Sequence, residues 1–217
     1  MLSSPLTRLA GPLALAAGVL IVLAQLLMLP FDPKDHVATS TDPVFQIGGG
    51  IYMAGFITLI LALIGAYGHG LHKAGRLGTV AFVSAVVGTM MLGGDLWFET
   101  FAVPWIADEA PAAFDTDPTI VLGLGAIASY LSFTIGWVLI GIAGYRSRAI
   151  PKSISVAIVI GGVVGFQALL APFAIPLALA VGSLGVWMIR SVSAARASTA
   201  VRVPTPGEHY TGSSAVA

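Results

Sequence analysis

The chain has 217 residues, of which 57% are hydrophobic and only 9% charged, with a net charge of zero and a mean hydropathy of +0.94. Soluble domains carry charge on about a quarter of their residues, so this composition excludes an ordinary soluble fold. The lack of a basic excess excludes a nucleic-acid-binding protein, and the absence of cysteine excludes disulfides and thiolate metal sites. We therefore predict an all-α integral membrane protein whose solvent is the lipid bilayer.

The first apolar segment runs from Leu9 to about Leu29, after Arg8. It is longer than the roughly 7–15 residues of a secretory signal core, and no small-residue cleavage site follows it directly. It therefore predicts a retained first span at 9–29. Three later stretches each supply the roughly 20 apolar residues that one spanning helix requires. They predict spans at 47–68, 77–96 and 119–144.

The last charge-free stretch, 153–189, is 37 residues long and too long for a single span. Pro172 and Pro176 lie in its middle, and proline ends or kinks helices. We therefore divide it into spans at 154–171 and 174–190, which makes six in all. The sequence predicts one membrane domain over 1–190 and a disordered cytoplasmic tail over 191–217, where Ser, Ala, Thr, Gly and Pro prevail.

The charges predict the orientation of the bundle, because cytoplasmic loops retain Lys and Arg. Nine of the ten basic residues lie on one predicted side, and nine of the ten acidic residues lie on the other. The two exceptions are Lys34 and Glu208. The basic side holds Arg8, Lys73, Arg76, Arg146, Arg148, Lys152, Arg190, Arg196 and Arg202. The acidic side holds Asp32, Asp35, Asp42, Asp95, Glu99, Asp108, Glu109, Asp115 and Asp117. Both termini are predicted to be cytoplasmic. The preference for Ala, Gly and Val, and for Arg over Lys, suggests a bacterial plasma membrane.

The longest predicted loop, about 97–118, carries Trp97, Phe101 and Trp105 among acidic residues. The favoured interpretation is an interfacial segment whose rings lie at headgroup depth. The alternative is a cap over a pocket between helices, lined by these three rings if the helix continues past Asp95. Pro104 argues against an uninterrupted helix there.

Asp95 is the ionisable residue nearest to a predicted membrane core, and intramembrane carboxylates suggest proton relays or cation sites. A continuing helix would place Glu99 on the same face, and two such acids bind hard cations if further ligands approach. Asp32, Asp35 and His36 in the first acidic-side loop are the nearest further ligands. A metal site formed by these five residues is less favoured than simple hydration of loop charges.

Cofactor binding is not predicted. His69 and His72 are the only paired histidines, and they lie in a basic turn rather than within facing helices, where haem ligands are found.

Uncharged polar residues within the spans suggest a polar path of Gln25, Tyr130 and Gln167 with Asp95. Gln25 and Gln167 are expected to face protein, since lipid offers an amide no partner. A stripe of small residues, Ala157, Gly161 and Gly165, predicts close helix packing, within the bundle or between copies.

The favoured function from sequence is a non-enzymatic membrane subunit or accessory protein. One alternative is a small-solute or ion transporter that uses the polar path. The other is an enzyme at the outer interface with Asp95 and Glu99 as acid and base, although no nucleophile or histidine stands beside them. Partners beyond lipid stay open between a homo-oligomer and another membrane protein.

Overall fold

The computed structural model describes residues 5–32 and 34–201, and all regular structure in these ranges is helical. The α-helices are α1 (Pro5–Met28), α2 (His36–Thr41), α3 (Pro43–His69), α4 (Arg76–Trp97), α5 (Val103–Glu109), α6 (Ile120–Ser147), α7 (Lys152–Val164) and α8 (Ile175–Val201). Short 3₁₀ turns are η1 (Leu71–Ala74), η3 (Pro111–Asp115) and η4 (Gly165–Gln167), and η2 (Phe98–Ala102) is a π-helical turn. The predicted all-α fold is confirmed.

Within the described residues, five helices are long and apolar enough to cross a membrane. They are Leu9–Met28, Pro43–His69, Arg76–Glu109, Ile120–Ser147 and Ile175–Ser193. A sixth apolar helix, Lys152–Gln167, is shorter. A multi-pass membrane protein is thus consistent with the fold, whereas the number of six spans and the orientation stay predictions.

Helix starts follow from capping residues at the acidic loops. Asp42 caps α3 by accepting hydrogen bonds from the backbone N–H groups of Val44 (2.7 Å) and Phe45 (3.4 Å). Pro43 follows it in the first turn, where its missing N–H costs nothing. Thr119 caps α6 through a bond from Leu122 N–H. The cap at Asp42 places the start of α3 at Pro43, four residues before the predicted boundary at 47.

The predicted loop at 97–118 is wrong over its first half, because α4, η2 and α5 form one continuous helical rod. The π turn ends at Ala102, two residues before Pro104. A proline in an ordinary helix clashes with the carbonyl four residues earlier, and the wider π turn relieves that clash. Pro104 therefore changes the pitch of the helix locally and does not end it.

The span predicted at 154–171 is also wrong at its end, since the helical turns stop at Gln167 and α8 begins only at Ile175. The residue before a proline avoids the α conformation, and Pro172 therefore prevents the helix from continuing through Ala171. The connecting segment 168–174 is defined here as the hairpin turn. At the other end α8 continues to Val201, so 191–201 is helical, while 202–217 lie outside the described residues.

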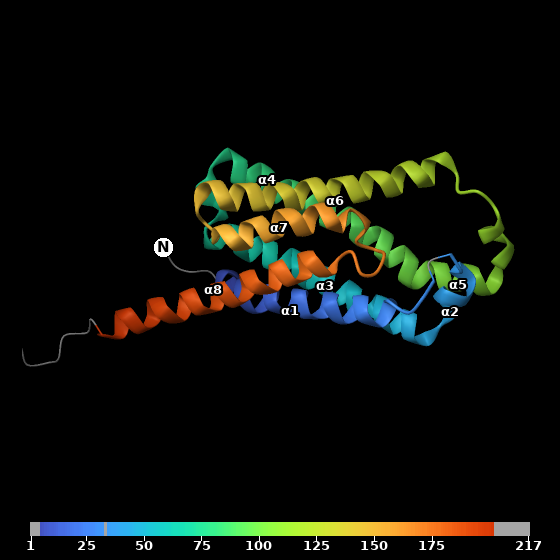
Figure 1. Cartoon of the computed structure of the whole chain (residues 1–217), viewed down its shortest axis with the longest axis horizontal. Coiled ribbons are helices and arrows are strands. Elements are labelled where there is room, and N and C mark those ends of the chain that lie inside the picture. The colour runs from blue at the N-terminus through green and yellow to red at the C-terminus, as the bar shows by residue number, and fades with distance from the viewer. Residues whose placement is uncertain (1–4, 33, 202–217) are drawn as a thin grey trace, which may run out of the picture.

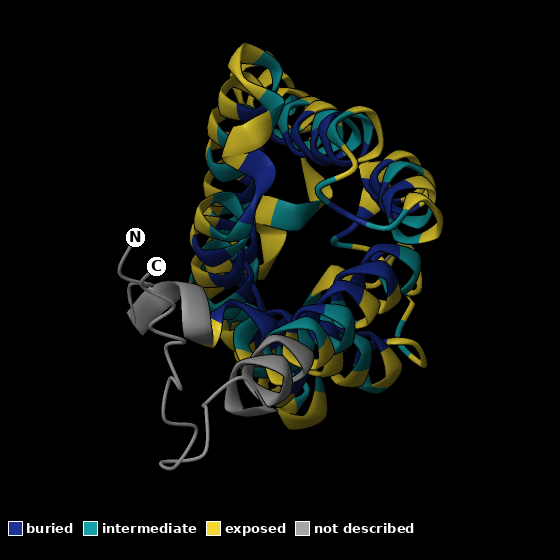
Figure 2. Ribbon diagram, turned by 90° about the vertical axis from the view of Figure 1, so that its left-hand side faces the viewer, coloured by how far each residue is buried: buried dark blue, intermediate teal, exposed yellow. Residues whose placement is uncertain are grey.

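The helices form a ring whose buried residues face inward (Figure 2). α1 packs on α3 and α8, α4 on α6, and α7 on both α6 and α8. Glycines permit the closest crossings: a methyl group added at Gly136 of α6 would lie 2.5 Å from the Cα of Ala85 in α4, and one at Gly18 of α1 would lie 2.6 Å from the carbonyl of Ala178 in α8. Such backbone contact drives helix association where the solvent is lipid.

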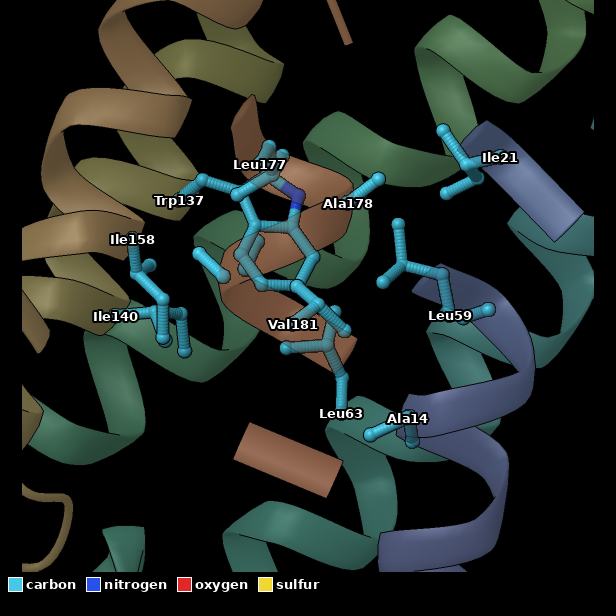
Figure 3. Close-up of a cluster of buried hydrophobic side chains, with 14 of the residues drawn as sticks. Ala14, Ile21, Leu59, Leu63, Trp137, Ile140, Ile158, Leu177, Ala178 and Val181 are labelled. Atoms are coloured by element: carbon cyan, nitrogen blue, oxygen red, sulfur yellow. The ribbon is translucent and has the colours of Figure 1, made fainter. Parts of the chain in front are cut away.

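The core is centred on Trp137 of α6 (Figure 3). Leu59 and Leu63 of α3 and Leu177 and Val181 of α8 surround it, all buried. The indole N–H donates to the hydroxyl of Thr89 in α4 at 3.2 Å, which satisfies the one polar group of the ring.

Charges separate to the two ends of the bundle, as the sequence predicts. We name them the acidic end, which holds α2, α5 and the start of α6, and the basic end, which holds η1 and the α6–α7 turn (Figure 1). The acidic end carries Asp32, Asp35, Asp42, Asp108, Glu109, Asp115 and Asp117, and the basic end carries Lys73, Arg76, Arg146, Arg148 and Lys152.

Candidate ligand pocket at the acidic end

A cavity of about 220 Å³ lies where α1, α2, α3, η2, α6 and the hairpin turn meet. Its lining is mostly apolar, with one carboxylate and a few other polar groups. The lining residues are Met28, Phe31, His36, Thr39, Phe45, Leu96, Glu99, Thr100, Tyr130, Leu169, Leu170 and Ala171. We call this cavity the acidic-end pocket.

The hairpin turn supplies one wall of this pocket, and two side chains from other helices hold it. Gln25 of α1 is fully buried; its amide N–H donates to Ala168 O at 3.1 Å, and its amide oxygen accepts from Ala174 N–H at 3.4 Å. The hydroxyl of Tyr52 in α3 donates to the same Ala168 carbonyl at 2.5 Å. Backbone groups without helical partners need others where the surroundings are apolar, and Gln25 and Tyr52 supply these partners at the two buried ends of the turn, Ala168 and Ala174.

The carboxylates lie on the α4 side of the pocket. Glu99 of η2 lines the cavity and is half-buried. Asp95 lies one turn away, close enough for the two charges to interact. Its Oδ2 atom is buried with no hydrogen-bond partner among the described residues. The neighbouring hydroxyl of Ser129 in α6 donates to Gly125 O at 3.1 Å. An unpaired carboxylate oxygen beside a second acid favours the approach of a cation or a donor.

The opposite wall is formed by α2 and the end of α1. His36 lines the pocket, lies close enough to Glu99 for electrostatic interaction, and stacks on Phe114 with ring centroids 6.0 Å apart. Phe31 and Phe45 pack edge to face at 5.5 Å. The pocket thus combines an acidic side with aromatic rings, a combination that suits an organic cation.

The five metal candidates are only partly brought together. Asp95, Glu99 and His36 lie at or beside the pocket, as described above. Asp32 and Asp35 are exposed and serve local turns, accepting bonds from Lys34 N–H at 2.9 Å and Ala38 N–H at 3.2 Å. Among the described residues, no group of three or more His, Asp or Glu side chains lies close enough to hold a metal ion.

The three aromatic residues of the rod do not cap the pocket. Trp97, Phe101 and Trp105 are 55%, 53% and 66% exposed, whereas the neighbouring residues Leu96 and Thr100 are buried. This arrangement agrees with interfacial aromatic residues directed at lipid. The alternative of a cap is therefore wrong for these three rings, and the interfacial interpretation stays a prediction.

The predicted polar path is discontinuous. Tyr130 lines the pocket, and Gln25 lies behind its wall with every bond directed at the hairpin turn. Gln167 is exposed, and the hydrogen bonds of the Gln25 amide go to Ala168 and Ala174, so the expectation that Gln167 faces protein is wrong for the single chain. Tyr52 was not among the polar residues singled out from the sequence. Its phenol within an apolar span could have identified it, because a buried Tyr hydroxyl requires a hydrogen-bond partner.

No known protein family, curated protein or solved structure matches this chain. The chemistry of the acidic-end pocket is therefore the evidence that bears on function.

Proposed function

We propose that this protein is a bacterial plasma-membrane protein with six crossings and cytoplasmic termini that binds a small organic cation in the acidic-end pocket, as the first step of transport. The observation that carries the proposal is a cavity bordered both by Glu99 and by the non-helical hairpin turn. Irregular backbone at membrane depth is tolerated where it lines a cavity, and transporters place broken helices at their solute sites.

Charge around the pocket supports a cationic ligand. The C-terminal end of α1 reaches the cavity at Met28, and α7 with η4 ends just before its wall at Leu169. Helix C-termini carry partial negative charge, which adds to that of Glu99 and Asp95. The volume of about 220 Å³ is below the roughly 300–1,000 Å³ of drug-sized sites, so the ligand is small.

Replacing Glu99 with glutamine is expected to weaken binding of tetramethylammonium at least about tenfold, because it removes the carboxylate that borders the cavity. Binding is measured as concentration-dependent thermal stabilisation of purified protein, with Glu109→Gln as the matched control, since Glu109 is exposed at the same end. Mg²⁺, Ca²⁺ and Zn²⁺ are run in parallel. Stabilisation by a metal ion but not by the organic cation would contradict the proposal and favour the metal site.

The proposed orientation predicts which introduced cysteines react from outside the cell. The chain has no cysteine of its own, so each single substitution is a unique reporter. Cysteine at Ala110, exposed at the acidic end, is expected to react with an impermeant thiol reagent on intact cells. Cysteine at Lys73, exposed at the basic end, and cysteine at Ser213 are expected to react only after lysis. Labelling of either one on intact cells would reverse or abolish the proposed topology.

A further inference from the structure

The N-terminal part of α6, residues 120–128, is mostly exposed. Ile120 and Val121 are 82% and 80% exposed, and Ile127 is 51% exposed. Methyl groups added at Gly123 or Gly125 would meet no atom within 4 Å. Gly123 and Ala126, on the face that continues to Tyr130, are half-buried, so within the described residues this part of α6 is covered only partly and on that one face.

α4 and α6 are tightly crossed nearer the basic end and separate toward the acidic end (Figure 1). A Cβ at Gly88 of α4 would collide with the backbone of Ser132 in α6. Beyond Asp95 and Ser129 the two rods diverge, with η2 and α5 on one side and residues 120–128 on the other. We call this opening the α4–α6 fork. The unpaired oxygen of Asp95 lies where the fork begins.

The acidic-end pocket borders this fork. Tyr130 is the only residue of α6 in its lining. On the same face of α6, the next positions toward the N-terminus are Ala126, Ile127 and Gly123. Ile127 is exposed, Gly123 has open space beside it and Ala126 is half-buried, so the wall that α6 offers beyond Tyr130 is incomplete. Both arms of the fork present apolar side chains outward, including Phe98 and Phe101 on η2. In a bilayer, acyl chains are the neighbours of such surfaces.

We propose that the ligand is an amphiphilic ammonium with a single apolar tail, which reaches the pocket sideways from the outer leaflet through the α4–α6 fork. The ammonium group binds beside Glu99 and Asp95, and the tail lies along residues 120–127 of α6. Charge complementarity selects the head group, and the uncovered apolar face of α6 gives the tail a surface to lie along. This inference rests on the proposed function and names its substrate class and its route.

The test compares tetramethylammonium with octyltrimethylammonium on protein in nanodiscs. Partitioning of the tailed cation into lipid is measured with the Glu99→Gln variant and subtracted. The octyl compound is expected to bind at least about tenfold more tightly, the gain from burying roughly two methylene groups.

Two glycine substitutions locate the tail. Gly123→Phe places a ring on the Tyr130 face, inside the fork, and is expected to weaken binding of the octyl compound at least about fivefold while leaving tetramethylammonium unchanged. Gly125→Phe places the same ring on the other side of the helix and is expected to change neither.

The outcomes separate this inference from the proposed function. If tetramethylammonium binds through Glu99 but the tail adds nothing, or if both glycine variants behave alike, the fork inference is overturned and the proposed function stands. If neither cation binds, both fail. If Gly123→Phe changes the oligomer size instead of ligand affinity, the fork is a protein interface and the inference is overturned.

Discussion

Replacing Gly161 with leucine is expected to lower the melting temperature of the purified protein by several degrees. A methyl group at Gly161 of α7 would lie 2.6 Å from the Cα and 2.7 Å from the backbone N of Leu177 in α8. These atoms belong to a helix backbone and cannot move aside singly, so α7 and α8 must separate. Overpacking of this kind costs about 1–3 kcal/mol, and each kcal/mol shifts melting by about 2–4 °C in a protein of this size.

Gly50→Leu is the matched control for this prediction. Gly50 lies in the interior of α3, and a methyl group there meets nothing within 4 Å. Both variants lose a helical glycine, so a difference between their melting temperatures reports packing alone. Equal melting of Gly161→Leu and wild type would mean that the α7–α8 hairpin tolerates separation.

The second large effect is expected at the hairpin turn. Gln25→Met keeps the approximate shape of the side chain but removes both of its hydrogen bonds to the turn. Ala174 N–H then loses the acceptor that Gln25 provides inside the bundle, and a buried unpaired group costs about 1–3 kcal/mol. Because the turn forms one wall of the acidic-end pocket, the variant is also expected to weaken binding of tetramethylammonium.

A double-mutant cycle with Tyr52→Phe tests the cause of this effect. Ala168 O accepts from both Gln25 and Tyr52, so either single variant leaves it one donor and the double variant leaves it neither. We expect the two losses in unfolding free energy to be non-additive, with the double variant worse than their sum by about 1 kcal/mol or more. Additive losses would show that the shared carbonyl is not the point of coupling. Thr58→Val is the control, since its hydroxyl bonds only to its own helix at Ala54 O and Gly55 O.

Much of the architecture could be predicted from the sequence because lipid imposes simple requirements. A spanning segment must be long and apolar, and its ends must carry the charges. The starts of α4 and α6 and the end of α6 accordingly lie within three residues of the spans predicted at 77–96 and 119–144, whereas the rod that begins with α4 continues to Glu109. The separation of acidic and basic ends follows from the same requirement. The close contact of Gly161 could be expected from its small-residue stripe, although the partner helix could not.

Tertiary contacts decided the parts that no local pattern encodes. Pro104 by itself predicts the end of a helix, yet the π turn before it keeps the rod continuous. Within this rod, Glu99 lines the pocket and Trp105 is exposed. Gln25 could be recognised as a polar residue in need of a partner, but its partners, Ala168 and Ala174, lie more than 140 positions away in the chain. Contacts of that range depend on how helices cross, and crossing depends on backbone shape rather than on hydropathy. The acidic-end pocket and the α4–α6 fork arise from those crossings. The sequence could therefore identify several of the residues around them but could not predict how these residues are arranged.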